Sequence, residues 1–250
     1  MGSFRVEERD GKQMLCIEMG PFNTQVLPYY GQYDTNKPTL GICTNYQLPN
    51  NVCGHTQRAF IQYWALRSFI ETGLVGVELG SAGVVAPMCI STDILGNGES
   101  HENYGGIMGG VQIKLDAADL GIFQTASLSC VLSSHVLEHV SCLRLRGNET
   151  PEQKIQIACN AIELIDIFRN HWLRVLVPGG YFCAVFPEEG AANRGGHSVF
   201  HQDLQHQHAI RADRFRSDVI QPLVDEGLVE VIEYDTFQNN FSCNVALRRR

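Results

Sequence analysis

The stretch V-E-L-G-S-A-G, Val77 to Gly83, decides the fold of this chain. Here an apolar run passes through an acidic residue, Glu78, into a turn that contains Gly80, Ser81 and Gly83. Glycine lacks the Cβ that would hold a ligand away, so the backbone N–H groups of such a turn can approach a bound molecule closely. The stretch predicts a strand that opens into a ligand site, and the alternative is a tight turn without a ligand.

Three further motifs follow in order, namely L-D-A-A-D-L (Leu115 to Leu120), S-S-H-V-L-E-H (Ser133 to His139) and R-V-L-V-P-G-G (Arg174 to Gly180). Together with their spacing, the four motifs resemble the class I S-adenosylmethionine-dependent methyltransferases. The resemblance is to the branch whose fourth strand runs into H-V-L-E-H and whose fifth follows R-V-L-x-P-G-G, and it extends from Leu74 to the C-terminus. One motif departs from the family pattern, because Ala82 and Val84 replace the second and third of its alternating glycines.

After Gly73 the chain alternates strand patterns with helix patterns. Strands are predicted at Leu74 to Leu79, Met88 to Thr92, Gln112 to Leu115, Ser129 to Ser133 and Tyr181 to Phe186, and helices at Pro151 to Leu173 and Asp213 to Asp225. Two final strands, Val229 to Tyr234 and Phe241 to Leu247, predict an antiparallel hairpin. Alternating units favour a parallel sheet flanked by helices. We therefore expect an α/β, Rossmann-like methyltransferase fold in residues 74–250, with a mostly parallel seven-stranded sheet.

Residues 1–73 are predicted to form a hairpin, an irregular arm and a helix that packs on the core. Asp10-Gly11 stands between two alternating runs, which is a strong hairpin signal. From Pro21 to Gly54 the chain is rich in Pro, Gly and Asn without a sustained period, which predicts irregular structure. Thr56 can cap a helix that ends at Gly73.

The overall composition narrows the possible partners and the compartment. A net charge of -8 argues against nucleic acid or an anionic membrane as the main partner, because both need clustered Lys and Arg. The nine cysteines form no C-x-x-C pair, which favours reduced thiols in the cytoplasm. The first residues alternate charged and apolar side chains, unlike a signal peptide. We expect a cytoplasmic protein with a small-molecule partner, and the oligomeric state stays open.

The resemblance implies S-adenosyl-L-methionine as cofactor and names the residues that would bind it. Asp93, at the end of the second strand, would accept two ribose hydroxyls, a role that also suits a dinucleotide dehydrogenase. Asp116 would bind the adenine amino group and Ala117 a ring nitrogen, although Asp116 and Asp119 can equally end a strand or cap a turn. The predicted cofactor-binding set is Glu78, Gly80, Ser81, Gly83, Asp93, Asp116, Ala117 and Ser133.

His135 is the candidate catalytic residue. Methyl transfer is an in-line displacement, so a base is needed only if the acceptor carries a proton that must leave. His135 follows the fourth strand at its C-terminal end, where ligands lie in open α/β sheets, and its imidazole can accept a proton near neutral pH. The alternative is that His135 only shapes the cofactor pocket. Glu138 and His139 are interpreted as structural.

Four histidines gather after the fifth strand, at His197, His201, His206 and His208. Their place beyond the C-terminal end of that strand predicts that His197, His201 and His208 contact the substrate. A metal site with help from Asp203 is geometrically possible, because His residues at these spacings share a face. We expect no metal, and the remaining alternative is a polar loop without a binding role.

These observations predict an enzyme, a methyltransferase that uses S-adenosylmethionine and a small-molecule acceptor whose reacting atom is unknown. The incomplete glycine motif supports an alternative from another class, a methyltransferase fold without catalysis that serves as a binding or scaffold protein. A nicotinamide-dependent oxidoreductase is disfavoured, since H-V-L-E-H followed by V-L-V-P-G-G is not typical of that class.

Overall fold

A computed structural model gives the backbone of residues 3–9, 12–18, 24–30, 41–42, 52–81, 85–96, 98–99, 110–140, 161–188, 210–238 and 242–250. It gives the side chains in these ranges from residue 60 onward, apart from 236–238. Every structural statement below concerns these described residues.

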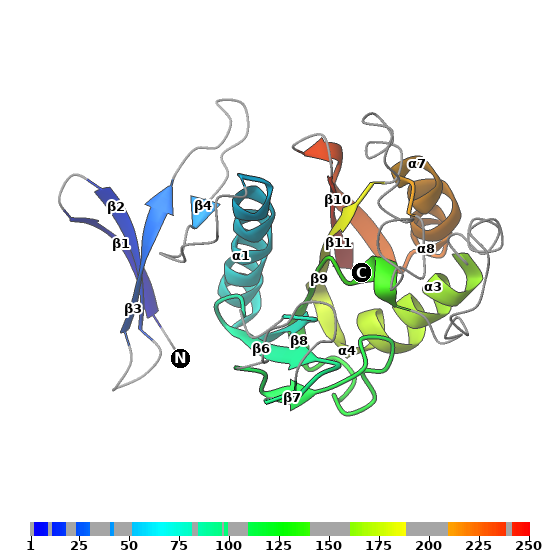
Figure 1. The fold of residues 1–250 in the computed structure, drawn as a ribbon, viewed down its shortest axis with the longest axis horizontal. Helices are drawn as coiled ribbons and strands as arrows, with labels where there is room; N and C mark the ends of the chain where they lie inside the picture. Colours follow the sequence, from blue (N-terminus) through cyan, green and yellow to red (C-terminus); the bar gives the residue numbers. More distant parts are fainter. Residues whose placement is uncertain are drawn as a thin grey trace.

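The core of the protein is a seven-stranded sheet (Figure 1). In chain order its strands are β5 (Gly76–Leu79), β6 (Cys89–Asp93), β7 (Ile113–Lys114), β8 (Leu128–Ser134), β9 (Leu176–Pro187), β10 (Val229–Gln238) and β11 (Ser242–Arg249). They lie in the order β10-β11-β9-β8-β5-β6-β7. Only β11 runs against its neighbours, β9 and β10, and the other neighbouring pairs are parallel. The mostly parallel sheet with a C-terminal hairpin is confirmed.

One helix, α1 (Val52–Thr72), covers one face of the sheet (Figure 1). Successive strand residues point to opposite faces, so every second residue of β8 and β9 meets this helix. The buried cluster on this face is made of Phe60, Ile61, Trp64, Ala65, Ala86, Cys130, Leu132, Tyr181, Cys183, Val185 and Ala246. Glu71 near the end of α1 accepts a hydrogen bond of 2.6 Å from the Tyr181 hydroxyl, which ties the helix to β9.

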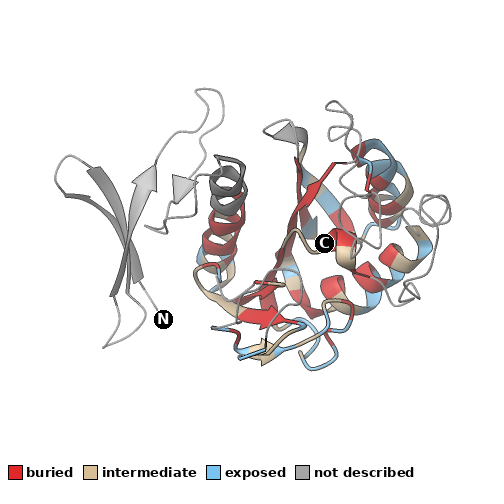
Figure 2. Ribbon diagram, in the orientation of Figure 1, coloured by how far each residue is buried: buried red, intermediate tan, exposed pale blue. Residues whose placement is uncertain are grey.

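The opposite face is covered by two composite helices. The first consists of α3 (Ala161–Ile167), η2 (Phe168–Trp172) and α4 (Leu173–Val175), and the second of α7 (Ala212–Phe215), η4 (Arg216–Ile220) and α8 (Gln221–Asp225). Phe168 packs edge-on against Trp172 and Phe182, at 4.7 and 4.6 Å between ring centroids. Figure 2 shows that the buried residues concentrate on the sheet and on the helix faces turned toward it. Apolar packing on both faces therefore stabilises this sheet.

The fifth parallel strand starts earlier than predicted, at Leu176 and not at Tyr181. The Pro-Gly-Gly of the motif lies inside β9, where the register with β8 shifts. Gly179 has a left-handed φ of +85°, and a Cβ on Gly180 would stand 2.8 Å from the carbonyl oxygen of Ser129. The glycines therefore allow a bulge in a continuing strand, whereas the sequence pattern alone favours a break.

The N-terminal residues pair as a four-stranded antiparallel sheet of β1 (Ser3–Arg9), β2 (Lys12–Glu18), β3 (Thr24–Tyr30) and β4 (Gly41–Ile42). The predicted hairpin is confirmed, with Arg9 paired to Lys12. The prediction of an irregular arm over Pro21 to Gly54 is wrong for β3 and β4. Pro28 hides the strand signal, but strand pairing with β2 and β4 supplies order that local composition does not reveal.

The start of the helix was also predicted wrongly. α1 begins at Val52, so Gly54 and Thr56 lie inside it and Thr56 is not its N-cap. A single glycine costs a helix only about 1 kcal/mol, which a long packed helix tolerates. Its end is confirmed, because Gly73 has a φ of +72° and its N–H donates to the Phe69 carbonyl. No helix among the described residues has the length and apolar character needed to span a bilayer.

Candidate functional site

The predicted cofactor residues that the structure describes lie at or shortly after the ends of four neighbouring strands, β5, β6, β7 and β8. Because these strands are parallel, their carboxyl ends lie at the same edge of the sheet. The structure brings the following residues to that edge: Glu78, Gly80, Ser81, Asp93, Asp116, Ala117, Ser133 and His135. We refer to this edge as the candidate site.

Glu78, near the end of β5, binds the segment that precedes β6. Its side chain is buried, and Oε2 accepts a short hydrogen bond from the backbone N–H of Ala86. A buried carboxylate needs such a partner, and the bond ties the end of β5 to the segment just before β6. Residues 80–81 and 85–88, the described part of the connection between β5 and β6, contain no helix. Glu78 therefore shapes the site.

Both the backbone conformation and the neighbouring side chain of Val136 require a glycine at position 80. Its φ is +58°, and a Cβ built on it would lie 2.3 Å from Cγ2 of Val136, which follows β8. Beside it, Ser81 is tied to β6, since its hydroxyl shares a hydrogen bond of 2.6 Å with Ser91 and its N–H donates to the Thr92 carbonyl. The turn is therefore held between β6 and the segment after β8.

Asp93 ends β6 and is largely buried, with 9% of its surface exposed. Its Oδ1 accepts a hydrogen bond of 3.1 Å from the N–H of Leu95, and its main-chain carbonyl accepts one of 2.7 Å from Leu115. The carboxylate thus starts the turn after β6, while the backbone connects β6 to the segment that carries Asp116.

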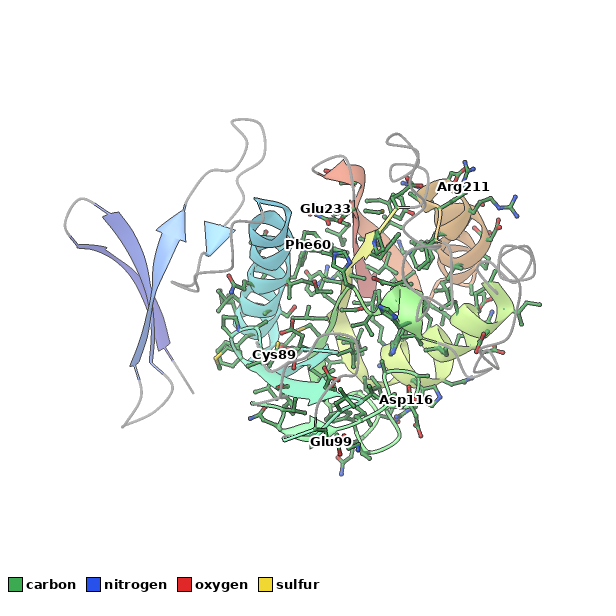
Figure 3. All side chains as sticks on the ribbon, viewed as in Figure 1. Phe60, Cys89, Glu99, Asp116, Arg211 and Glu233 are labelled. Carbon is green, nitrogen blue, oxygen red and sulfur yellow. The ribbon has the colours of Figure 1, made fainter. Side chains whose placement is uncertain are left out.

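Asp116 and Asp119 both stabilise turns, as the alternative interpretation predicted for this pair. Asp116 is exposed, in the loop after β7 (Figure 3), and its Oδ1 accepts a hydrogen bond of 2.9 Å from Ala118. Asp119 accepts one of 2.8 Å from Gly121. Asp116 lies directly after β7 at the candidate site, whereas Asp119 lies farther along, 3.4 Å from His171.

The loop that contains Asp116 is held by the helix before β9. Trp172 donates from Nε1 to the carbonyl of Ala117 at 2.8 Å. Arg174 donates to the carbonyls of Leu120 and Phe123, at 2.8 and 3.0 Å. These contacts give the arginine of R-V-L-V-P-G-G a physical role, because its guanidinium can bind several carbonyl groups at once. The two motifs are therefore joined in space.

His135 follows β8 with a left-handed φ of +56°, a conformation that is uncommon for a residue other than glycine. Its backbone N–H donates to the Val185 carbonyl at 2.8 Å. Its Nδ1 lies 3.3 Å from Oε1 of Glu138, and 34% of the His135 side chain is exposed while only 2% of the Glu138 side chain is. An imidazole at the edge of the site is thus backed by a buried carboxylate.

The charge of Glu138 is maintained by its histidine neighbours. Burial alone would raise the pKa of this carboxyl, but the hydrogen bond from His135 and the charges of His135 and His139 hold the pKa below its ordinary value. Its other oxygen, Oε2, is buried and has no hydrogen-bond partner among the described residues. The Ser133 hydroxyl is likewise buried and has no hydrogen-bond partner among the described residues. Buried polar atoms without partners are uncommon in proteins, so both atoms call for an explanation.

The chemistry of the site suits the adenosine part of S-adenosylmethionine. That group presents two ribose hydroxyls and an amino group, all of which donate hydrogen bonds. The site offers the carboxylates of Asp93 and Asp116 as acceptors, together with the unpartnered hydroxyl of Ser133. The contact with Val136 already explains why residue 80 is a glycine, without any ligand. The fit of the site to adenosine therefore depends on the acidic and hydroxyl groups.

Several predicted residues lie outside the described residues. They are Gly83 of the glycine turn and the four loop histidines, His197, His201, His206 and His208. Their roles stay predictions. Within the described part of the chain, no three His, Cys, Asp or Glu side chains are placed to hold a metal ion.

The contact of Glu138 with His135 and the anchoring roles of Trp172 and Arg174 are not predicted from the sequence. A signal for Glu138 was present, because an acidic residue three positions after a histidine, between apolar residues, suggests a buried carboxylate beside an imidazole. No local signal connects Arg174 to Leu120, since the contact is between residues far apart in the chain.

No protein-family model and no curated protein sequence matches this chain. Among solved structures it is similar to the N-methyltransferase NodS from Bradyrhizobium japonicum WM9, at 15% identity and a TM-score of 0.46 over 81% of this chain and 99% of that one. It is also similar to a geranyl diphosphate C-methyltransferase from Streptomyces coelicolor A3(2), at 11% identity and a TM-score of 0.43 over 81% of this chain and 87% of that one.

A third similar structure is the 1,6-didemethyltoxoflavin-N1-methyltransferase of Burkholderia thailandensis, at 13% identity and a TM-score of 0.41 over 78% of this chain and 80% of that one. Likeness at this level says nothing about activity. The strand order, with its single reversed strand, is the Rossmann-like architecture that the resemblance to class I methyltransferases implied.

Proposed function

We propose that this protein is a methyltransferase that uses S-adenosylmethionine and acts on a small-molecule acceptor. One observation carries the proposal: the strand ends that bear Glu78 and Gly80, Asp93, Asp116 and His135 lie side by side at one edge of a parallel sheet. Open α/β sheets bind ligands at that edge. Three of the four motifs that suggested the family in the sequence therefore meet at this edge, whereas the fourth, R-V-L-V-P-G-G, lies at the start of β9 and anchors the loop that follows Asp116.

In this proposal the acidic residues bind the nucleoside part of the cofactor. Asp93 accepts the two ribose hydroxyls, each charge-assisted hydrogen bond being worth about 1.5–3 kcal/mol. Asp116 binds the adenine amino group, and Ala117 offers its backbone to the ring. Glu78, Gly80, Ser81 and Gly83 are proposed to form the turn beside the cofactor, with Ser133 adjacent to it.

When bound, S-adenosylmethionine supplies an electrophilic methyl group on a sulfonium sulfur, which keeps the bonding electron pair when the methyl group leaves. The protein's task is to orient the acceptor in line and to exclude water. His135 takes the acceptor's proton where there is one to remove. His197, His201 and His208 are proposed to recognise the acceptor.

Calorimetry with S-adenosylhomocysteine tests the proposal. We expect saturable binding at one site per chain, weakened when Asp93 is replaced. Heat on addition of NAD, with none on addition of S-adenosylhomocysteine or S-adenosylmethionine, would refute it.

The second candidate is a binding or scaffold protein with the same fold and no catalysis. Ala82 and Val84 favour it, because side chains at these positions restrict the approach of a ligand to the turn. The two candidates differ in turnover. A catalytic protein transfers a radiolabelled methyl group from S-adenosylmethionine to a component of a small-molecule extract, whereas a scaffold binds the cofactor and leaves the label in place.

The proposed compartment is the cytoplasm. Cys89, Cys130, Cys183 and Cys243 are free thiols, which suits a reducing environment. Sedimentation of fractionated cells, with the protein followed by antibody, tests this.

A further inference from the structure

The left-handed backbone of His135 decides where its side chain goes. A residue in this conformation leaves the strand direction abruptly, and the N–H of His135 is still held by the Val185 carbonyl of the neighbouring strand. The imidazole consequently turns toward the short η1 helix (Leu137–His139) and meets the carboxylate of Glu138. Strained backbone of this kind is concentrated at functional sites.

The contact joins a buried group to a partly exposed one. The Glu138 side chain is 2% exposed and that of His135 is 34% exposed, at 3.3 Å between Oε1 and Nδ1. A carboxylate buried only for stability would gain from complete pairing, yet Oε2 has no hydrogen-bond partner among the described residues. Stability is therefore a poor explanation for an acidic residue here.

The chemistry of the pair dictates which nitrogen carries the proton. An ionised carboxylate only accepts hydrogen bonds, so Nδ1 of His135 must donate to it. In the neutral imidazole the other nitrogen, Nε2, then has a lone pair and no proton. The same logic applies wherever a buried carboxylate holds a histidine that acts as a general base.

We propose that Glu138 is a positioning residue that holds His135 in the Nδ1–H tautomer, so that Nε2 is the proton acceptor for the substrate at the candidate site. This rests on the methyltransferase function proposed above. The acceptor group is then an O–H or an N–H. Its bond to hydrogen breaks, the proton moves to Nε2, and the electron pair left on oxygen or nitrogen forms the bond to the methyl carbon.

The carboxylate has a second effect in this step. When Nε2 takes the proton, His135 becomes an imidazolium, and the negative charge of Glu138 stabilises it at close range. The imidazolium afterwards returns the proton to water. Acceptors without a removable proton, such as thioethers, do not need this pair.

The test is the tautomer of His135, read from the imidazole nitrogen shifts of the full-length protein labelled with ¹⁵N-histidine. The His135→Asn variant assigns the signals, because asparagine also tolerates a left-handed backbone. At a pH where His135 is neutral, we expect Nδ1 to be protonated and Nε2 to be bare. In Glu138→Leu, which removes the hydrogen-bond acceptor, the population shifts at least several-fold toward the Nε2–H form, which the histidine side chain prefers in water.

The wild-type measurement keeps the proposal falsifiable even if Glu138→Leu fails to fold. An Nε2–H tautomer for His135 in the wild-type protein overturns the proposal, and so does an unchanged tautomer in a folded Glu138→Leu. The matched control is His139→Gln, which leaves the His135 tautomer as it was. The affinity for S-adenosylhomocysteine is measured on the same samples. If the protein does not bind S-adenosylhomocysteine, the proposed methyltransferase function is refuted. The tautomer of His135 reports only on its pairing with Glu138.

Discussion

Val136 fills the space that a side chain on Gly80 would need, with its Cγ2 only 2.3 Å from the position of a Cβ there. The two residues follow neighbouring parallel strands, β5 and β8. Their contact seals the turn after β5 against the segment that carries His135, so Gly80 serves the packing of the site as well as its backbone conformation.

Gly80→Ala is expected to destabilise the fold by about 2–4 kcal/mol, from the left-handed backbone and the overlap with Val136 together. Urea unfolding measures the loss. Gly98→Ala is the control, because Gly98 has a φ of +83° but nothing within 4 Å of its Cβ position, so only about 1 kcal/mol is lost there. In a Val136→Ala background the cost of Gly80→Ala falls by about 1 kcal/mol or more. Equal costs in both backgrounds would contradict the packing role.

Asp93→Ala is expected to weaken S-adenosylhomocysteine binding by about 1.5–3 kcal/mol, because the ribose hydroxyls lose a charged acceptor. Asp119→Ala, which removes another turn-forming carboxylate, changes the affinity little. Isothermal titration calorimetry compares them, and circular dichroism verifies that both variants fold. Similar losses in the two variants would mean that the aspartates act only through the fold.

Arg174→Ala should release the loop that contains Asp116, because it removes the donors to the Leu120 and Phe123 carbonyls. We expect a loss of about 1–3 kcal/mol in stability and faster amide hydrogen exchange at Ala118 and Gly121. Arg214→Ala removes an exposed ion pair with Asp218 and serves as the control, with a change below about 0.5 kcal/mol. Exchange rates that do not differ between the two variants would refute the anchoring role.

The hydrogen bond from Tyr181 to Glu71 predicts a pH effect on stability. Burial and this bond raise the pKa of Tyr181 to about 12. A pKa raised on folding stabilises the native state below the unfolded value near 10, and the contribution is lost as the pH rises toward 12. Tyr181→Phe should therefore lose about 1 kcal/mol at pH 7 and show a smaller further loss between pH 10 and 12. Parallel denaturation curves for both proteins across that range would contradict this.

Glu71, which accepts this hydrogen bond, affects the stability of the protein at low pH. The pKa of Glu71 lies below its ordinary value: burial opposes this, but the hydrogen bonds from Tyr181 and Arg67 outweigh it. A lowered pKa stabilises the native state above the unfolded value near 4.3, and this contribution disappears as the pH falls through the folded value. Glu71→Gln should thus flatten the acid limb of the stability curve relative to the wild type, as measured by thermal unfolding from pH 7 downward.

His201→Ala and His208→Ala should leave S-adenosylhomocysteine affinity within a factor of a few and abolish methyl transfer to the acceptor, without any effect of chelators. Transfer of a radiolabelled methyl group measures turnover, calorimetry measures affinity, and elemental analysis detects a metal. A stoichiometric metal that is lost together with activity would favour the metal alternative, and unchanged turnover in both variants would assign the histidines to a polar loop.

Much of the sheet was determined by the sequence itself. The strands β5, β6, β8 and the C-terminal hairpin were predicted within a few residues, because short apolar runs between turn residues are a local signal. The places of Asp93 and Asp116 follow from the same signal, since each comes at or directly after a strand end. Gly73 likewise marked the end of α1 by its own conformational freedom.

Tertiary structure alone decided how these pieces meet. The strand β3 depends on pairing with β2, and β9 continues through Pro-Gly-Gly because β8 pairs with it on either side of this segment and Arg248 of β11 donates to the Gly179 carbonyl. The pairing of His135 with Glu138 depends on a left-handed residue that Val185 fixes from another strand. Arg174 reaches Leu120 only after the intervening chain has folded back. The strand pairings and the Arg174 contact leave no local pattern, because their energy comes from groups that are far apart in the chain and meet only in the folded state.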